Sequence, residues 1–545
     1  MIDREAVRTN AKYLRNVRPI DPDEIYEYIE DQPHPAVVRE TLREEAFELG
    51  LRERADGTFV PASTDPIPDP MWQPDMLPRR YDDVIADHLV ERFGPEWYHG
   101  DSGAMLRSTI RRLKRDYYQQ NPVEYDQTVA LGYAIYHFAD YYAAIGYVLD
   151  DLLEQGCLSE TLRILDVGAG VGGPAVGIHD YLPESSLVEY HAVEPSAGVN
   201  ILTDILAETR RNFRTTIHHE SAESFDPTRI GSADNERPFD LVLCANVLSE
   251  LNDPSVVAKQ YLSAVATDGS FIGLAPADKH TSIRLRAIER MLTGDVSTEP
   301  PFGHEDQQIP SDIVSDLSTV ETPDQRIDAT VYAPTLRLWS EKTPADRGWS
   351  FDRRPMITAP PTQQRLDDAP REAGESEMAT SEQTHNNSEA AGDGTFRNET
   401  VQFSYTIIRR DGTTRAPVSA NPRRHAAMEA METHVTNRID LLGVKLSHDL
   451  TTSPTQKLNQ HRRGQGYSNA QPSHNNDNPV FKIGDGSQTT DNYAVITVED
   501  TLTESLLTAE YGAVLAFENV LCLWNDDEDA YNLVIDDESV VDVIA

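Results

Sequence analysis

The sequence predicts an α/β protein built on a doubly wound, Rossmann-like parallel sheet, with an N-terminal helical region and a C-terminal β-rich module. Between residues 160 and 295, short runs rich in β-branched residues alternate with helical stretches, as in βαβ units. The first of these runs ends in a glycine-rich turn, and such sheets bind ligands at that edge. Beyond residue 399, short strand-like runs separated by Gly, Asn and Asp turns are typical of a small β-barrel, of OB type.

The charge of the chain is its most distinctive compositional property. Its 91 acidic and 48 basic residues give a formal net charge of −43. Only 8 of the bases are Lys, so 48 − 8 = 40 are Arg. Acids spread along a Lys-poor chain are typical of proteins that stay hydrated in molar salt, where screening acts over about 3 Å. We therefore expect a halophilic, archaeal protein, and an acidic surface for a basic partner is the alternative.

This interpretation predicts that folding depends on salt. At low salt the carboxylates repel one another over longer distances, which destabilises the compact state. The melting temperature is therefore expected to rise between about 0.1 M and 1 M KCl. A thermal melt over that range measures the effect, and a constant melting temperature would contradict the halophilic interpretation.

The sequence pattern argues against several classes of protein. No apolar run approaches the roughly 20 residues of a membrane helix, and the first ten residues lack the apolar core of a signal peptide. The cysteines Cys157, Cys244 and Cys522 lie far apart, so we expect neither a disulfide framework nor a four-cysteine metal site. We expect a cytoplasmic protein without membrane contact.

Residues 1–65 are predicted to form a separate N-terminal module. Two apolar-periodic stretches predict helices, and LRERADGTFV (51–60) predicts a hairpin around the turn Asp56-Gly57. Two helices followed by a hairpin are typical of a winged-helix domain. A helical interaction module is the alternative, because acids match bases along the second helix.

Residues 70–156 are predicted to be a helical region for substrate recognition. Aromatic residues recur at helical spacing in 133–153, which is typical of core packing, and stacking on bases is the alternative. The densest basic cluster of the chain precedes this stretch. A salt-bridged helix face is the alternative to an RNA contact there. The candidate RNA-binding residues are Arg107, Arg111, Arg112, Lys114 and Arg115.

Residues 157–355 are predicted to hold the cofactor. A buried strand ends in Asp166, and Gly168 and Gly170 follow in a turn where the backbone can approach a ligand closely. A second strand ends in Glu194, placed to accept hydrogen bonds from a ribose diol, as in sites for NAD and for S-adenosylmethionine (SAM). An acid at Asp166 would repel a pyrophosphate, so SAM is favoured.

Two further strand ends complete the predicted site. Ser221 and Ala222 follow the third strand, where polar groups suit an adenine amine. Asn246 follows the fourth strand, at the expected methyl-transfer face, and is the candidate catalytic residue. Capping of a following helix is the alternative role for Asn246.

The remaining segments differ in composition from the predicted domain. Residues 356–398 are polar and nearly free of large apolar residues, which predicts a disordered linker. Residues 399–545 are predicted to form the β-rich module, with a disordered insert at 451–478.

Three motifs together resemble a class I SAM-dependent methyltransferase. They are D-V-G-A-G-x-G-G, A-V-E-P-S and F-D-L-V-L-x-x-N-V-L-S-E-L. The last run, with the upstream aromatic helix, is similar to the methyltransferase-like family of small-ribosomal-subunit assembly. That resemblance implies SAM as the cofactor and ribosomal RNA or the small subunit as the partner.

The chain also departs from that family. Residues 296–355 contain no cysteine where members carry a metal or iron–sulfur cluster, so no metal is expected. Asn246 is not followed by the Pro-Pro-Tyr of amino-group methyltransferases. We expect methyl transfer to RNA; a SAM-binding assembly factor without catalysis and a small-molecule methyltransferase are the alternatives.

Overall fold

The computed structural model divides the chain into two compact units. It describes residues 2–30, 32–70, 72–119, 121–230, 238–294, 327–340, 342, 350–353, 357–371, 391–451 and 478–545. Unit 1 contains residues 1–245, 264–270 and 360–397. Unit 2 contains residues 246–263, 271–359 and 398–545.

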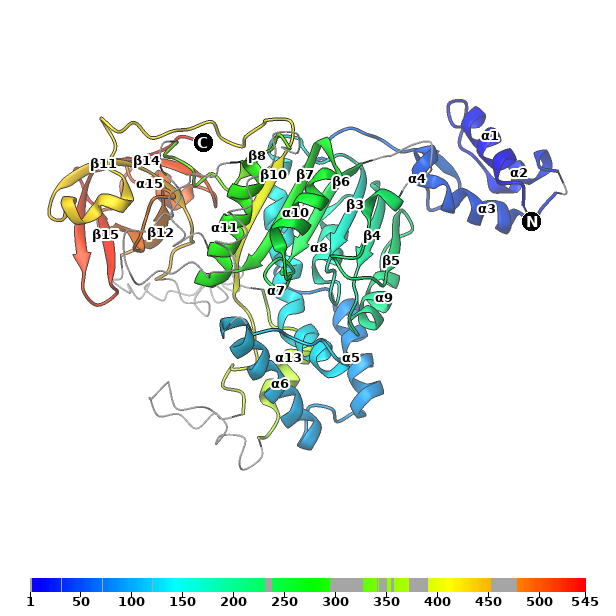
Figure 1. The fold of residues 1–545 in the computed structure, drawn as a ribbon, viewed down its shortest axis with the longest axis horizontal. Helices are drawn as coiled ribbons and strands as arrows, with labels where there is room; N and C mark the ends of the chain where they lie inside the picture. The colour runs from blue at the N-terminus through cyan, green and yellow to red at the C-terminus, as the bar shows by residue number, and fades with distance from the viewer. Residues whose placement is uncertain are drawn as a thin grey trace, which may run out of the picture. The chain divides into compact units, whose positions relative to one another are not determined.

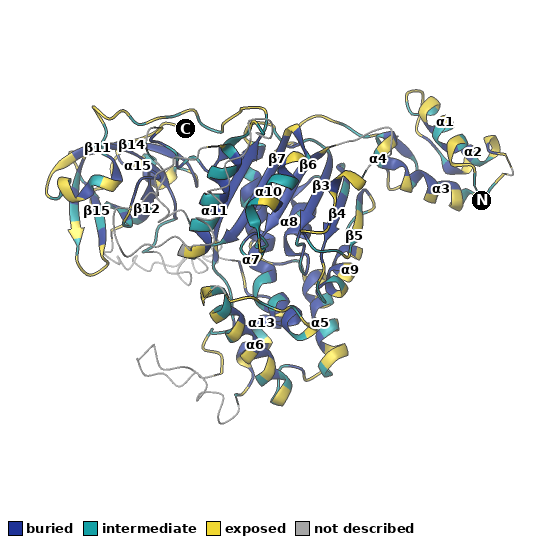
Figure 2. Cartoon of the chain, in the orientation of Figure 1, coloured by how far each residue is buried: buried dark blue, intermediate teal, exposed yellow. Residues whose placement is uncertain are grey.

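Four parallel strands form the sheet of unit 1 in the order β5-β4-β3-β6. The strands are β3 (Thr161–Val167), β4 (Leu187–Val193), β5 (Phe213–His218) and β6 (Phe239–Ala245). The helices α8 (Gly173–Tyr181) and α9 (Val199–Ala207) follow β3 and β4, which gives the βαβ units predicted from the sequence. Figure 2 shows β3, β4 and β6 largely buried, as hydrophobic parallel strands must be, whereas the edge strand β5 is partly exposed.

The large sheet is mixed rather than purely parallel, which corrects the expectation. Its order continues from β6 through β7 to β10 and β8, and the unit boundary falls within β7. In unit 2, β10 pairs antiparallel with β8 and β9. The bounds are β7 (Val265–Pro276), β8 (Thr330–Ala333), β9 (Phe351–Arg353) and β10 (Val401–Arg409). The sequence predicted β10 as part of the C-terminal module, because a strand's own residues do not identify its partner. The helices α10 (Pro254–Ser263) and α11 (Lys279–Thr293) complete this part of the chain.

The N-terminal module consists of short helices and a hairpin. Its elements are α1 (Arg4–Leu14), α2 (Pro22–Ile25), η1 (Tyr26–Tyr28), α3 (Pro35–Glu44), α4 (Ala46–Leu49), β1 (Leu51–Glu53) and β2 (Phe59–Pro61). In α3, Arg43 forms an ion pair with the buried Glu53, and Glu44 pairs with Arg4. Charges of α3 are therefore engaged within the module, and the winged helix and the helical interaction module both stay predictions.

A helical layer precedes the sheet in unit 1. Its helices are α5 (Arg79–Phe93), α6 (Gly100–Gln119) and α7 (Gln127–Leu153). The helix α7 is buried along most of its length and packs against α8 (Figure 1). A Cβ at Gly177 of α8 would lie 2.5 Å from the carbonyl oxygen of Tyr142, so only glycine permits this close approach. The aromatic residues Phe138, Tyr141 and Tyr142 of α7 are buried, so they contribute to the core.

The described part of the predicted disordered linker is ordered, which is a second correction. Residues 361–368 form α13 (Pro361–Asp368), and Leu366 is buried. The buried carboxylate of Asp367 accepts backbone hydrogen bonds from Gly394 and Phe396. Polar residues satisfied by hydrogen bonds hold this segment in place, so few large apolar residues are needed. Residues 372–390 lie outside the described residues.

The C-terminal module is a β-barrel-like sheet in which five strands form a closed ring. The order is β11-β12-β13-β15-β14, β11 also pairs with β14, and β16 pairs with β14. The pair β13–β15 is parallel. The bounds are β11 (Arg438–Lys445), β12 (Val480–Gly484), β13 (Asn492–Ile496), α15 (Glu504–Thr508), β14 (Val514–Asn525), β15 (Ala530–Ile535) and β16 (Val540–Val543). Residues 452–477 of the predicted insert at 451–478 lie outside the described residues.

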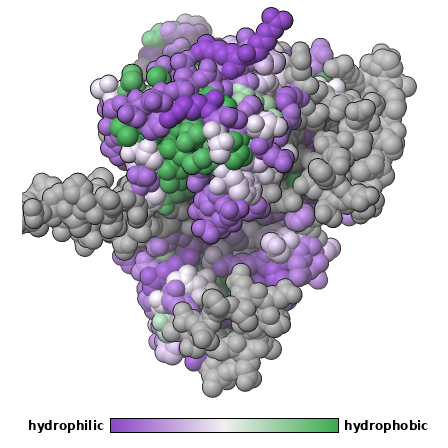
Figure 3. Space-filling model, turned by 90° about the vertical axis from the view of Figure 1, so that its left-hand side faces the viewer, coloured by the Kyte–Doolittle hydropathy of each residue, from purple (hydrophilic) through white to green (hydrophobic). Residues whose placement is uncertain are grey.

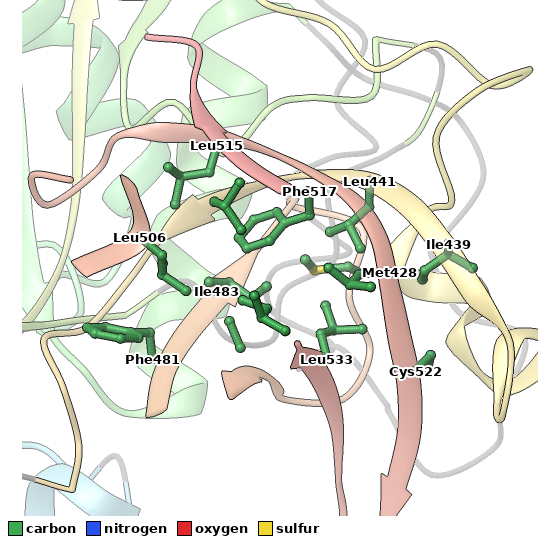
Figure 4. Packing of buried hydrophobic residues seen from close by; sticks show 14 of the residues in the cluster. Met428, Ile439, Leu441, Phe481, Ile483, Leu506, Leu515, Phe517, Cys522 and Leu533 are labelled. Atoms are coloured by element: carbon green, nitrogen blue, oxygen red, sulfur yellow. The ribbon is translucent and has the colours of Figure 1, made fainter. Parts of the chain in front are cut away.

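Inward-facing side chains from the barrel strands form one hydrophobic core. Figure 4 shows Ile483, Phe517 and Leu533 pointing toward one another, and these three residues and Phe481 are buried. Met428, from the 3-10 helix η5 (Met428–His434) that precedes β11, packs into the same core. On the face shown in Figure 3, hydrophilic residues surround one hydrophobic area.

None of the described helices is long and apolar enough to cross a membrane. The three cysteines are free, and Cys244 and Cys522 are buried.

Candidate functional site

The turn after β3 has a backbone that requires glycine. Gly168, Gly170 and Gly172 have φ angles of 72°, 57° and 92°, in the left-handed region that side chains disfavour. A Cβ built on Gly170 would meet only the carbonyl oxygen of Gly168, at 3.9 Å. The turn therefore leaves open space at Gly170, at the carboxyl edge of the sheet where α/β folds bind ligands.

Asp166, next to this turn, is a fully buried acid. One carboxylate oxygen, Oδ2, accepts a hydrogen bond from the hydroxyl of Tyr190 at 2.5 Å. The other, Oδ1, has no hydrogen-bond partner among the described residues. Burial raises the pKa of Asp166 to about 7, and the charge of Glu194 acts in the same direction. A buried, half-satisfied carboxylate is costly unless a ligand donor completes it.

Glu194 has a role that the sequence did not predict. Its Oε2 accepts the backbone N–H of Gly170 at 2.7 Å, and its Oε1 accepts the N–H of Ser196 at 2.7 Å. The carboxylate thus fixes the glycine turn, and each oxygen keeps a second lone pair for a ribose hydroxyl. A sequence pattern cannot reveal this role, because it depends on β3 and β4 being neighbours.

Ser221 and Ala222 lie in the turn that follows β5. Ser221 donates to the hydroxyl of Ser224 at 3.1 Å, and Ala222 is buried. The strands β3, β4 and β5 run parallel, so Asp166, Glu194 and Ser221 belong to one edge of the sheet.

Asn246 follows β6 directly and belongs to unit 2. It has a positive φ of 59°, which Asn tolerates better than most residues, and its N–H donates to the carbonyl of Leu274 at 2.8 Å. The helix α10 begins only at Pro254, so the alternative role of Asn246 as its cap is wrong. Non-glycine residues with a positive φ, such as Asn246, are often found in active sites.

The predicted absence of a metal stays a prediction. The pair His191 and His218 stacks with ring centroids 5.4 Å apart. Within the described ranges, no group of three His, Cys, Asp or Glu side chains is arranged to hold a metal ion.

Two of the five predicted RNA-binding residues are engaged inside unit 1, and the full burial of Arg107 corrects the expectation for that residue. Arg107 is fully buried and donates to the carbonyl oxygens of Tyr98 and Leu366 at 3.3 Å and 3.4 Å. Lys114 donates to the carbonyl oxygen of Thr395 at 3.2 Å. The basic cluster of α6 therefore anchors the segment around α13, which the sequence had treated as disordered.

The other three arginines of α6 differ in exposure. The Arg111 guanidinium lies over the ring of Phe396, 5.0 Å from its centroid. Arg115 is exposed and pairs with Asp116 at 3.6 Å. Arg112 is exposed on the helix surface. The RNA contact at α6 stays a prediction, and Arg112 and Arg115 are its exposed residues.

This arrangement predicts opposite effects for two arginines of α6. Arg107→Ala is expected to lower the free energy of unfolding by about 2–4 kcal/mol, because it leaves a cavity and two unpaired carbonyls. Arg112→Ala, the matched control, is expected to stay within about 0.5 kcal/mol of wild type. Urea titration of both variants measures the difference, and equal stability would show that Arg107 is not a structural anchor.

Family comparisons agree with this geometry. Residues 165–271, which span β3 to β7, match a family model described as a methyltransferase domain. Residues 4–55 match the N-terminal domain, and residues 429–544 the C-terminal domain, of a domain of unknown function (DUF8157). The expectation of a methyltransferase is confirmed, and the expected cofactor, SAM, agrees with it. No curated protein matches the chain.

Solved structures of methyltransferases are also similar to the chain. A SAM-dependent methyltransferase from Clostridium acetobutylicum is 14% identical, with 27% of this chain and 52% of that chain covered and a TM-score of 0.20. The chain thus spans about half the length of that protein. The glycopeptide N-methyltransferase MtfA, complexed with SAM, is 17% identical, with 25% and 56% covered and a TM-score of 0.20. The mitomycin 7-O-methyltransferase MmcR is 12% identical, with 58% and 80% covered and a TM-score of 0.22.

Proposed function

We propose that this chain transfers a methyl group from SAM, with the β3 turn holding the cofactor. The observation that carries the proposal is the buried Asp166, whose Oδ1 lacks a partner beside an open glycine turn. A cationic ligand would supply the missing donor and favour the ionised carboxylate. Asp166 would hold the cofactor amine, and Glu194 would hold both the turn and the ribose.

When bound, SAM supplies an activated methyl group, so the chain need contribute little acid–base chemistry. The residues then act by orientation, which is worth several kcal/mol when the reacting atoms are aligned. The tip of β6, where Asn246 has its unusual backbone, is the proposed methyl-transfer face. Tyr190 holds the Asp166 carboxylate in one orientation through its hydroxyl.

We propose RNA as the substrate. The more specific proposal of ribosomal RNA is based on the resemblance of the V-L-S-E-L motif to the ribosome-assembly family. The topology of the C-terminal barrel, rather than the basic residues of α6, supports RNA as the substrate. Its strand order is first-second-third-fifth-fourth, with the third and fifth strands parallel and α15 between the third and fourth. We propose that this is an OB-type barrel, a fold whose members bind oligonucleotides.

The test is methyl transfer from isotope-labelled SAM in a cell extract, with the products separated by size and treated with ribonuclease. Label in ribonuclease-sensitive material supports RNA as the substrate. Label confined to small molecules would overturn it. SAM binding without any transfer would favour the non-catalytic assembly factor, an alternative that the missing Pro-Pro-Tyr after Asn246 keeps open.

A further inference from the structure

A basic pocket lies in unit 2, outside the proposed cofactor site. Its volume is about 790 Å³, within the usual range of ligand pockets. Its walls come from the segment after β8 and from residues 422–440, around η5 and the start of β11. The side chains that matter most are Trp339, Lys342, Arg423, Arg424, His425 and Arg438.

The lining of this pocket contains more basic than acidic side chains, unlike the chain as a whole. Acids outnumber Lys and Arg by 91 to 48 overall. The lining contains four Lys or Arg side chains and one acid, Asp440. The Asp440 carboxylate accepts the backbone N–H of Asn519 at 2.8 Å, so part of its charge is compensated. A local cluster of cations is therefore the property that sets this surface apart.

Two cations of the pocket are engaged in ion pairs, Lys342 with Glu429 and Arg438 with Asp536 and Glu538. Arg423 and Arg424 keep donors available. Arg424 pairs with Glu518, but their side chains are 57% and 43% exposed, and exposed pairs contribute little. A guanidinium has five N–H donors, so an arginine with one carboxylate partner can still bind an anion. The Arg423 guanidinium has no ion-pair partner within the described part of the chain.

A buried carboxylate fixes both walls of the pocket. Asp485 is 1% exposed, and its Oδ2 accepts the indole N–H of Trp339 at 2.7 Å and the backbone N–H of Met428 at 2.8 Å. The Asp485 carboxylate therefore ties the Trp339 wall to the segment that carries the arginines. Such preorganisation lowers the conformational cost of binding.

His425 adds a directed neutral donor. Its Nδ1 accepts the backbone N–H of Asn421 at 3.0 Å, which places the ring proton on Nε2. Burial and the charge of Arg424 lower the pKa of His425 below its usual value.

We propose that this pocket binds a phosphate ester of nucleotide size, with Arg423 and Arg424 as its main phosphate contacts. Arginine forks match the oxygens of a phosphate group in a bidentate way. A free nucleotide and one nucleotide of an RNA strand share this chemistry. The pocket residues are different from those of the proposed cofactor site, and they belong to unit 2 whereas the β3 turn belongs to unit 1.

The test compares uridine 5′-monophosphate with uridine, using the full chain and calorimetry at the lowest KCl concentration at which the chain stays folded. The monophosphate is expected to bind at least about tenfold more tightly than uridine, because only it carries the phosphate. Arg423→Gln and Arg424→Gln are each expected to weaken monophosphate binding by about tenfold. Arg54→Gln, which changes an exposed arginine in unit 1, is the matched control and should bind like wild type.

Competition with a short oligouridine identifies the source of the phosphate. Displacement of the monophosphate by the oligomer supports an RNA strand, and failure to displace it supports a free nucleotide. Equal affinities for the monophosphate and uridine, no binding of either, or wild-type binding by both arginine variants would overturn the proposal. SAM binding of Arg423→Gln is measured in parallel, so that a failed phosphate site is told apart from a failed cofactor site.

Discussion

Asp166→Asn is expected to weaken SAM binding by about ten- to a hundredfold, the largest effect of any single change at the cofactor site. A hydrogen bond to a charged group contributes about 1.5–3 kcal/mol, and the amide cannot supply that charge. Calorimetry measures the affinities. Glu208→Gln, an exposed acid just beyond α9, is the control and should bind like wild type.

The pH dependence of binding gives a second readout for Asp166. Its pKa is about 7, above the ordinary 3.8, so the folded chain holds the proton more tightly than the unfolded chain does. Asp166 therefore lowers the free energy of unfolding as pH rises from about 4 to about 7. A cationic ligand favours the ionised form, so wild-type affinity for SAM is expected to rise between about pH 6 and pH 8. A wild-type profile as flat as that of Asp166→Asn would contradict the assigned contact.

Glu289→Gln is expected to lower the free energy of unfolding of unit 2 by about 3–5 kcal/mol, the largest stability effect that we predict. Glu289 is fully buried in α11 and pairs with Arg286 at 2.6 Å and with Arg337. Burial, with the charge of Arg286, lowers the pKa of Arg337 to about 9. Loss of the carboxylate would leave the buried Arg286 and the partly exposed Arg337 without their shared anion.

The control for Glu289 is a carboxylate whose ion pair is exposed. Glu518→Gln breaks the pair with Arg424 on the barrel surface and is expected to cost less than about 1 kcal/mol. Guanidinium denaturation with separate probes for the two units measures both changes. Similar midpoints for the two variants would show that the Glu289 cluster does not stabilise unit 2.

The cofactor turn was predictable because its evidence is local. A hydrophobic strand, an acid and glycines within a few residues specify a strand, a turn and a helix in that order. The left-handed backbone at Gly168 and Gly170 follows from the same run. The role of Glu194 in holding Gly170 was not predictable, since it depends on which strands are neighbours.

The elements that sequence analysis placed wrongly depend on distant partners. The strand β10 has the pattern of a barrel strand, and only its pairing with β7 assigns it to the large sheet. The arginines of α6 show a basic face in sequence, but the partner that buries Arg107 is Leu366, 259 residues away. Trp339 and Arg423 likewise line one pocket although they are far apart in sequence, and a hydrogen bond from Trp339 to Asp485 helps to hold them there. Periodicity within one segment contains no information about such pairs.

The interleaving of the two units along the chain decides how the protein can be divided in the laboratory. The polypeptide changes unit at 245/246, 263/264, 270/271, 359/360 and 397/398, which makes five crossings. Neither unit is therefore a continuous stretch that a gene fragment could encode. A deletion that starts at residue 401 would also remove β10 from the large sheet, so a barrel truncation should begin beyond Arg409.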